Sequence, residues 1–207
     1  MFDTNKVTIN AMSQDLKLEI AATAARLVVE DGLEYGPAKR RAAKQLGVSH
    51  RQSLPDNEHL EAAVRDYIAI YCAESQAMEL RALRSLALVW MRRLSVFRPH
   101  LAGAVFRGTA TRRSDIFLQL FCDDPKSAEI QLIDAGVRYD VRSVPGFNGD
   151  EVDALSIQAR CGELKENVGI HLLIHDFDAL RGALKADAQG RKLRGDQAAV
   201  ELLLQET

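Results

Sequence analysis

The chain has 207 residues, 47% hydrophobic and 27% charged, which suits one globular domain or one domain with an appended helical part. Residues 1–121 carry 17 Lys and Arg against 13 Asp and Glu, and residues 122–207 carry 10 against 16. The resulting charges of +4 and −6 exclude the strongly basic surface typical of a dedicated nucleic-acid-binding protein. Nucleic acid therefore stays open as a partner, but the composition does not indicate it.

Cysteine content and hydropathy exclude two further classes of protein. Cys72, Cys122 and Cys161 are odd in number and widely spaced, so they predict reduced thiols and neither a disulfide framework nor a metal-binding pair. No basic start is followed by an apolar core, and no apolar run approaches the roughly 18 residues that span a bilayer. We expect a cytoplasmic protein with no membrane partner.

The first elements along the chain are predicted helices. Residues 1–14 lack a pattern and predict a loose leader, whereas apolar residues recur at helical spacing over 15–29. The glycines of "EDGLEYG" end this helix, and Pro37 opens a second one that Gly47 closes. A third helical stretch over 58–97 is predicted to break near residues 73–76, giving two helices, and Asp56 or Asn57 is predicted to cap the first of them.

The second half alternates between strand and helix patterns, which predicts an α+β class with a mixed sheet flanked by helices. Strands are predicted in "HLAGAVF", "SDIFLQLFCDD" and "VRYDVRSV", and a hairpin is predicted in "DALSIQAR" and "NVGIHLLIH". Helices are predicted over 125–136, 178–187 and 196–205. The chain would thus divide into a helical region, 1–96, and an α/β domain, 97–207. The Leu- and Ala-rich helix over 78–96 could serve a protein partner or a homodimer.

A loop of small residues between a strand and a carboxylate suits a site for a triphosphate and a metal ion. Small residues let backbone N–H groups approach phosphate oxygens, while a carboxylate holds Mg²⁺ beside them. The segment "GAVFRGTATRRSDIF" has this form. It resembles the nucleotide-binding signature of DNA polymerase beta-like nucleotidyltransferases, which runs Gly-Ser, three residues, Gly, five residues, then Ser-Asp-hydrophobic-Asp. The "AARLVVEDGLEYGPAKRRAAKQLG" and "LPDNEHLEAAVRDY" segments also resemble a small proteobacterial group with this signature.

The resemblance implies a nucleotidyltransferase-like fold for residues 97–207 and a set of site residues. Asp115 would be the first acid of the signature, and Asp140, on the strand after the next helix, would be the further acid. Both would be catalytic and would bind Mg²⁺, which is the implied cofactor. The nucleotide-binding residues implied by the match are Gly103, Ala104, Arg107, Gly108, Thr109 and Ser114.

Two positions depart from the signature. Its second acid follows the first by two residues, so that both side chains share one face of a strand, but this position is Phe117, which cannot coordinate a metal. The signature's Ser is Ala104, so a hydroxyl contact to phosphate is absent. Gln119 and Asp176 are further candidates to supply an oxygen ligand. The pattern therefore predicts a degenerate active site.

The histidines near this signature do not predict a metal site or a catalytic set. His171 and His175 lie four apart in a predicted strand, where roughly 13 Å separates them, so they do not predict a shared metal ion. No Gly-x-Ser-x-Gly segment occurs, and no Ser-His-Asp set is expected.

The arginines of the segment and its neighbours leave two interpretations open, because they could surround a polyanion or could serve surface solubility. They are Arg92, Arg93, Arg98, Arg107, Arg112 and Arg113, with Lys192 and Arg194 as possible additions.

Three functions follow from this pattern. The first is a nucleotidyltransferase-like protein that binds an NTP or another anionic ligand without efficient turnover. The second is an active Mg-dependent nucleotidyltransferase that uses Asp115 and Asp140. The third is a non-catalytic scaffold whose helical half carries the interaction.

Overall fold

The computed structural model describes residues 4–48, 54–147, 149–187 and 189–206, with side chains from Gln14 onward. The chain divides into two compact units, Met1–Gln76 and Ala77–Thr207. The predicted boundary at 96 is therefore not the one seen. The helix α4 (Gln76–Arg93) belongs to the second unit because it buries Leu83, Trp90 and Met91 in the same apolar core as the sheet.

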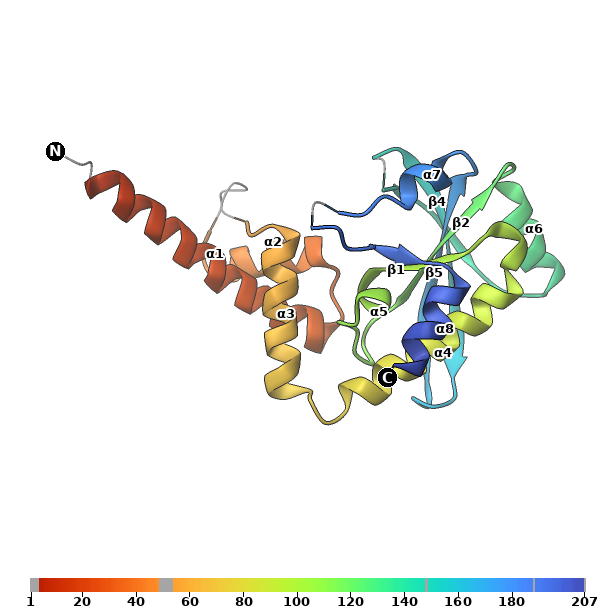
Figure 1. Ribbon diagram of the computed structural model, residues 1–207, viewed down its shortest axis with the longest axis horizontal. Coiled ribbons are helices and arrows are strands. Elements are labelled where there is room, and N and C mark those ends of the chain that lie inside the picture. The colour runs from red at the N-terminus through yellow and green to blue at the C-terminus, as the bar shows by residue number, and fades with distance from the viewer. Residues whose placement is uncertain (1–3, 49–53, 148, 188, 207) are drawn as a thin grey trace. The chain divides into compact units, whose positions relative to one another are not determined.

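The described residues of the first unit form three helices: α1 (Thr4–Asp31), α2 (Tyr35–Gln45) and α3 (Asn57–Tyr71) (Figure 1). Asp56 is the N-cap of α3, and its carboxylate accepts a hydrogen bond of 2.8 Å from the backbone N–H of His59, as the sequence predicted. The three helices share one small core, which consists of Ile20, Ala24, Ala25, Leu27, Val28, Val29, Ala38, Ala42, Ala43, Leu60, Val64 and Ile68.

The prediction of a loose leader over residues 1–14 is wrong from Thr4 onward, because α1 begins there. No glycine or proline occurs between Thr4 and Asp31. Extending an existing helix costs little per residue once its nucleus is formed, so a polar segment without a breaker continues the helix that follows it.

The second unit is a six-stranded mixed sheet with helices, so the predicted α+β class with an N-terminal helical region is confirmed. The strand order is β3-β4-β5-β2-β1-β6; β2 and β5 are parallel, and the other neighbours are antiparallel. After α4, its elements are η2 (Ser95–Phe97), β1 (His100–Ala102), α5 (Gly103–Arg107), β2 (Ile116–Cys122), α6 (Lys126–Asp134), β3 (Asp140–Pro145), β4 (Glu151–Cys161), β5 (Glu166–Asp176), α7 (Ala179–Ala183), β6 (Arg194–Gly195) and α8 (Gln197–Gln205).

One predicted strand and one predicted helix are wrong in part. The strand expected over 100–106 ends at Ala102, because Gly103 has φ of +71° and the next residues form α5. A run of small and apolar residues without strict alternation suits a buried helix turn as well as a strand, so its pattern did not distinguish them. The helix expected over 178–187 covers only Ala179–Ala183. The hairpin of β4 and β5 is confirmed.

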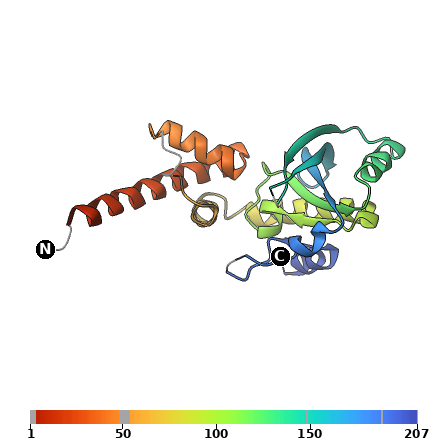
Figure 2. The same cartoon turned by 90° about the horizontal axis from the view of Figure 1, so that it is seen from above.

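The two faces of the sheet differ in chemistry. Even-numbered residues of β2 and β5, such as Leu118 and Leu172, are buried with the helices of this unit, and Figure 2 shows α4 and α8 on one side of the sheet. Odd-numbered residues form the opposite face, which we call the polar face. It carries Phe117, Gln119 and Phe121 from β2, His171, Leu173 and His175 from β5, and Ser156 from β4.

Candidate functional site

The segment that carries the signature connects β1 to β2 through a short helix and a tight loop. Gly103 begins α5, and Gly108 ends it with φ of +83°, a conformation that favours glycine. The backbone N–H of Thr109 donates to the carbonyl of Ala104 at 3.0 Å. All predicted nucleotide-binding residues therefore lie in one continuous loop that ends at Asp115, directly before β2.

Two buried side chains of α4 fix this loop, and neither was among the residues predicted for the site. The guanidinium of Arg84 is 5% exposed and donates to the carbonyls of Val105 and Phe106, at 3.2 and 3.4 Å. The carboxylate of Glu79 accepts from the backbone N–H of Arg112 at 2.9 Å. A buried charge on a predicted amphipathic helix is the signal that could have identified Arg84, since such groups require partners.

Asp115 lies directly before β2, and two hydrogen-bond donors from β5 hold its carboxylate. Its carboxylate accepts from the backbone N–H of Gly169 at 3.2 Å and lies 3.0 Å from Nε2 of His171, while 48% of its side chain is exposed. Gly169 is required here, because a Cβ at this position would lie 2.5 Å from Oδ1 of Asp115. Asp115 is thus oriented by the fold and still reaches solvent.

The hydrogen bonds continue from His171 to β4. Nδ1 of His171 lies 2.9 Å from Oγ of Ser156. A neutral imidazole that donates from Nε2 to Asp115 accepts from the Ser156 hydroxyl at Nδ1, so the three side chains form one directed chain. This Ser-His-Asp set was not expected from the sequence. It depends on the pairing of Ser156 with His171 in the hairpin, and on the parallel pairing of β5 with β2.

The position of Ser156 argues for a structural role of this hydrogen-bonded set. Ser156 lies within β4, which pairs with β3 on one side and β5 on the other. Its neighbouring backbone N–H groups therefore belong to the sheet ladder, whereas a nucleophilic serine needs free donors to stabilise an oxyanion. The set orients Asp115 and provides no acyl-transfer site.

Phe117 occupies the space beside Asp115 on the polar face. Its ring stacks on the imidazole of His171, with centroids 4.8 Å apart and planes at 28°. A Cβ added to Gly103 would lie 3.5 Å from the Phe117 ring, so the ring is also close to the start of the loop. An aromatic side chain therefore fills the space between the loop and β5.

The structure does not bring Asp140 to Asp115. Asp140 lies on β3 opposite Ser156, and β4 and β5 separate β3 from β2. Three strand spacings correspond to about 14 Å, and the side chains of Ser156 and His171 lie between the two acids. Among the described residues, no group of three or more His, Cys, Asp or Glu side chains is placed to hold a metal ion.

The two further oxygen candidates also lie elsewhere. The amide oxygen of Gln119 accepts from Nη1 of Arg194 at 2.6 Å. Asp176 pairs with Cys122 at the far end of β2, seven residues from Asp115, which corresponds to about 23 Å along the strand. Neither residue contributes to a site at Asp115.

Most of the arginines that could have surrounded a polyanion have partners within the protein. Arg112 pairs with Glu166, Arg92 pairs with Glu201 at 2.8 Å, and Arg93 and Arg98 lie over the rings of Trp90 and Phe177. Arg107 ends α5, and Arg113 is exposed in the loop. Arg107 and Arg113 thus add positive charge to the loop itself, beside Arg112.

Comparison with family models, with curated proteins and with solved structures finds no match to this chain. Within the part of the chain that the structure describes, no helix is both long and apolar enough to cross a bilayer.

Proposed function

We propose that the chain is a nucleotidyltransferase-like protein with a degenerate active site, which binds a nucleotide or another polyanion without efficient transfer. The order of elements supports the proposal: a short strand, a glycine-bounded loop, Asp115 at the start of β2, and a parallel neighbour, β5. The observation that carries it is the position of Phe117, packed against His171 and Gly103 where the signature has its second acid.

The geometry around Asp115 favours binding over transfer. Two-metal transfer needs several carboxylates that converge on a pair of ions, which activate the attacking oxygen and stabilise the leaving group. Here a single exposed carboxylate is oriented by Gly169 and His171. The active alternative with Asp115 and Asp140 requires the two acids to cross the intervening strands, so the structure does not favour it. Arg107 and Arg113 would neutralise the phosphates.

The proposal is tested by thermal denaturation of the full chain with each NTP and with inorganic triphosphate, in the presence and absence of Mg²⁺ or Mn²⁺. We expect stabilisation by at least one of these anions without added metal. The double variant R107Q/R113Q should lose most of the stabilisation, whereas R138Q/R142Q, a charge-matched control with Arg142 on β3 and Arg138 two residues before the strand, should keep it. No stabilisation by any of these anions would contradict the binding proposal.

A transfer assay with labelled NTP distinguishes the degenerate site from an active nucleotidyltransferase. We expect the wild-type chain to release no pyrophosphate and to label no product with Mg²⁺. The variant Phe117→Asp restores the missing acid and should make nucleotide binding depend on Mg²⁺; Phe117→Asn, which lacks the charge, is its control. Metal-dependent transfer by the wild-type chain that is lost in both Asp115→Asn and Asp140→Asn would overturn the degenerate site.

One observation favours a second role, protein interaction through the helical unit. The helix α3 ends with two adjacent apolar side chains, Ile70 and Tyr71, which are 70% and 68% exposed. Light scattering over a range of concentrations should show self-association that I70S/Y71S abolishes. A monomer at all concentrations, with no change in the variant, would leave this role without support.

A further inference from the structure

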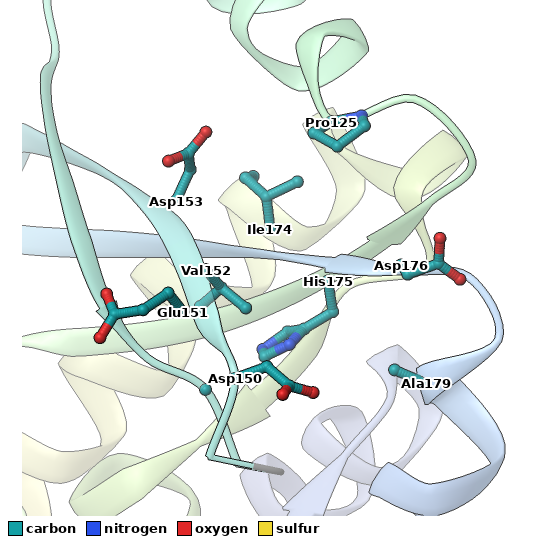
Figure 3. A pocket seen from close by; sticks show the side chains of 10 residues that line it. Pro125, Asp150, Glu151, Val152, Asp153, Ile174, His175, Asp176 and Ala179 are labelled. Carbon is teal, nitrogen blue, oxygen red and sulfur yellow. The ribbon is translucent and has the colours of Figure 1, made fainter.

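A pocket lies on the second unit, at the opposite end of β2 and β5 from Asp115. It has a volume of about 330 Å³ and is formed by the start of β4, the end of β5 and the turns beside them (Figure 3). The carboxyl ends of parallel strands are common ligand sites in α/β sheets, and β2 and β5 are the parallel pair here. The predicted nucleotide-binding residues are not part of its lining.

The pocket is strongly acidic. Asp150, Glu151, Asp153 and Asp176 line it, and the lining residues include no lysine or arginine. Two cations outside the lining lie close to it: Lys126 binds Glu129 at 2.7 Å, and Arg194, whose charge acts on His175, binds Gln119 and lies over Phe147. The pocket therefore carries negative charge that its own lining does not neutralise.

His175 provides an independent indication of a ligand. Its side chain lines the pocket, is only 4% exposed and points toward Asp150 (Figure 3). Nε2 of this imidazole is buried and has no hydrogen-bond partner among the described residues. An unpaired buried polar atom typically costs about 1–3 kcal/mol, so a donor that enters the pocket would remove this cost.

His175 is uncharged at neutral pH. The rings of Phe121 and Phe147 lie 5.5 and 4.7 Å from the imidazole, centroid to centroid. Burial and the neighbouring charge of Arg194 lower the pKa of His175 to about 4. The imidazole is therefore neutral at pH 7, and with its proton on Nδ1 it presents a lone pair at Nε2 to an N–H donor.

The arrangement of the lining distinguishes between a metal ion and an organic cation. The carboxylates do not converge: Asp150 lies beside the imidazole of His175, Asp176 points away from it at one end of the pocket, and Glu151 and Asp153 lie toward the other end (Figure 3). No set of three metal-binding side chains occurs among the described residues. Apolar surface from Pro125, Val152 and Ile174 lies between the charges. Separated carboxylates with apolar surface between them match ammonium groups joined by methylene chains.

We propose that this pocket binds an aliphatic polyamine, with Asp150 and Asp176 pairing with its ammonium groups, His175 accepting one N–H donor, and Val152 contacting its methylene chain. This inference concerns a site outside the proposed nucleotide site and does not depend on it. Nucleotide binding and polyamine binding can therefore fail separately.

The test is calorimetric titration of the full chain with spermidine and putrescine at fixed ionic strength. We expect saturable binding with one site, and spermidine binding more tightly than putrescine. The variant D150N/D176N should weaken spermidine binding by at least about tenfold, because two charge-assisted hydrogen bonds are lost. His175→Phe keeps an aromatic ring between Phe121 and Phe147 and should weaken binding by about fivefold through loss of one acceptor.

Matched controls decide between this site and general charge attraction. The variant D134N/E163Q also removes two exposed carboxylates of the second unit, but neither residue lines the pocket; its spermidine affinity should equal that of the wild type. An equal loss in D134N/E163Q and D150N/D176N would overturn the proposal, as would the absence of saturable binding. Tighter binding of Mg²⁺, Mn²⁺ or Zn²⁺ at the same residues would replace the polyamine with a metal ion and would also overturn it.

Discussion

The two ends of the polar face hold similar residues, but the polar atoms are paired at one end and one of them is unpaired at the other. At the Asp115 end, the carboxylate, His171 and Ser156 satisfy one another, and Phe117 covers the remaining space. At the other end, a second Phe–His stack, formed by Phe121 and His175, leaves an imidazole nitrogen unpaired beside an acidic pocket. The comparison shows that a Ser-His-Asp set in which every polar group has a partner can have a structural role. A buried polar atom without a partner is the stronger indication of a ligand.

The largest expected effect is at Arg84, which fixes the loop of the Asp115 end. Arg84→Met leaves the carbonyls of Val105, Phe106 and Leu203 without this donor, and we expect a loss of about 3 kcal/mol in the free energy of unfolding. Arg81→Met is the control, because Arg81 is exposed and donates to the carbonyl of Leu204 at 3.2 Å. Urea denaturation measures both; equal losses would show that the loop does not depend on Arg84.

The next effect is on the free energy of unfolding at the other end of the polar face, where His175 makes it depend on pH. The folded-state pKa of His175 is about 4 against 6.5 for the free side chain. The unfolded chain therefore binds more protons between these values, and stability that is present above pH 6.5 is lost as the pH falls toward 4. We expect His175 to account for about 3 kcal/mol of this loss. His175→Phe removes it, so identical pH profiles for the variant and the wild type would contradict the prediction.

A smaller effect tests how tightly Asp115 is held. Gly169→Ala places a Cβ 2.5 Å from the carboxylate oxygen, and we expect a cost of about 1–2 kcal/mol in the free energy of unfolding. In an Asp115→Ala background the clash is absent and the cost should fall to near zero. A double-mutant cycle measures the coupling between the two positions. An unchanged cost in both backgrounds would mean that Gly169 serves the strand and not Asp115.

The smallest effect is at the exposed pair of Arg112 and Glu166. Both side chains reach solvent, so salt and water screen their attraction. We expect Arg112→Gln to leave the denaturation midpoint unchanged within error at physiological salt, as for the neighbouring exposed control Arg113→Gln. A marked, salt-sensitive loss in Arg112→Gln alone would make this pair a structural part of the Asp115 end.

The elements that the sequence predicted well are those with local patterns. Runs of apolar residues bounded by turn residues indicated β2 and the β4–β5 hairpin, and Asp56 marked the start of α3. The segment from Gly103 to Arg107 was misread because its small residues suit two conformations. Local pattern also placed the unit boundary too late, since it detects α4 but not the core that α4 joins.

The site could be predicted only in part because its contacts come from pairing between distant strands. Asp115 and Phe117 were identified from the spacing of the signature that the segment resembles. The partners of Asp115 follow from the parallel register of β2 and β5, which no local pattern encodes. The pocket at His175 combines the start of β4 with the end of β5, and His175 gained its significance from burial, which spacing does not report.

The parallel pairing of β2 with β5 also bears on the order in which the molecule folds. The hydrogen bond between Asp115 and His171 joins residues 56 positions apart, whereas Ser156 and His171 are 15 apart within a hairpin. Closing the longer loop costs more chain entropy, so the hairpin is expected to form first and to dock on β2 late. Substitutions at Asp115 should therefore speed unfolding and leave the folding rate almost unchanged.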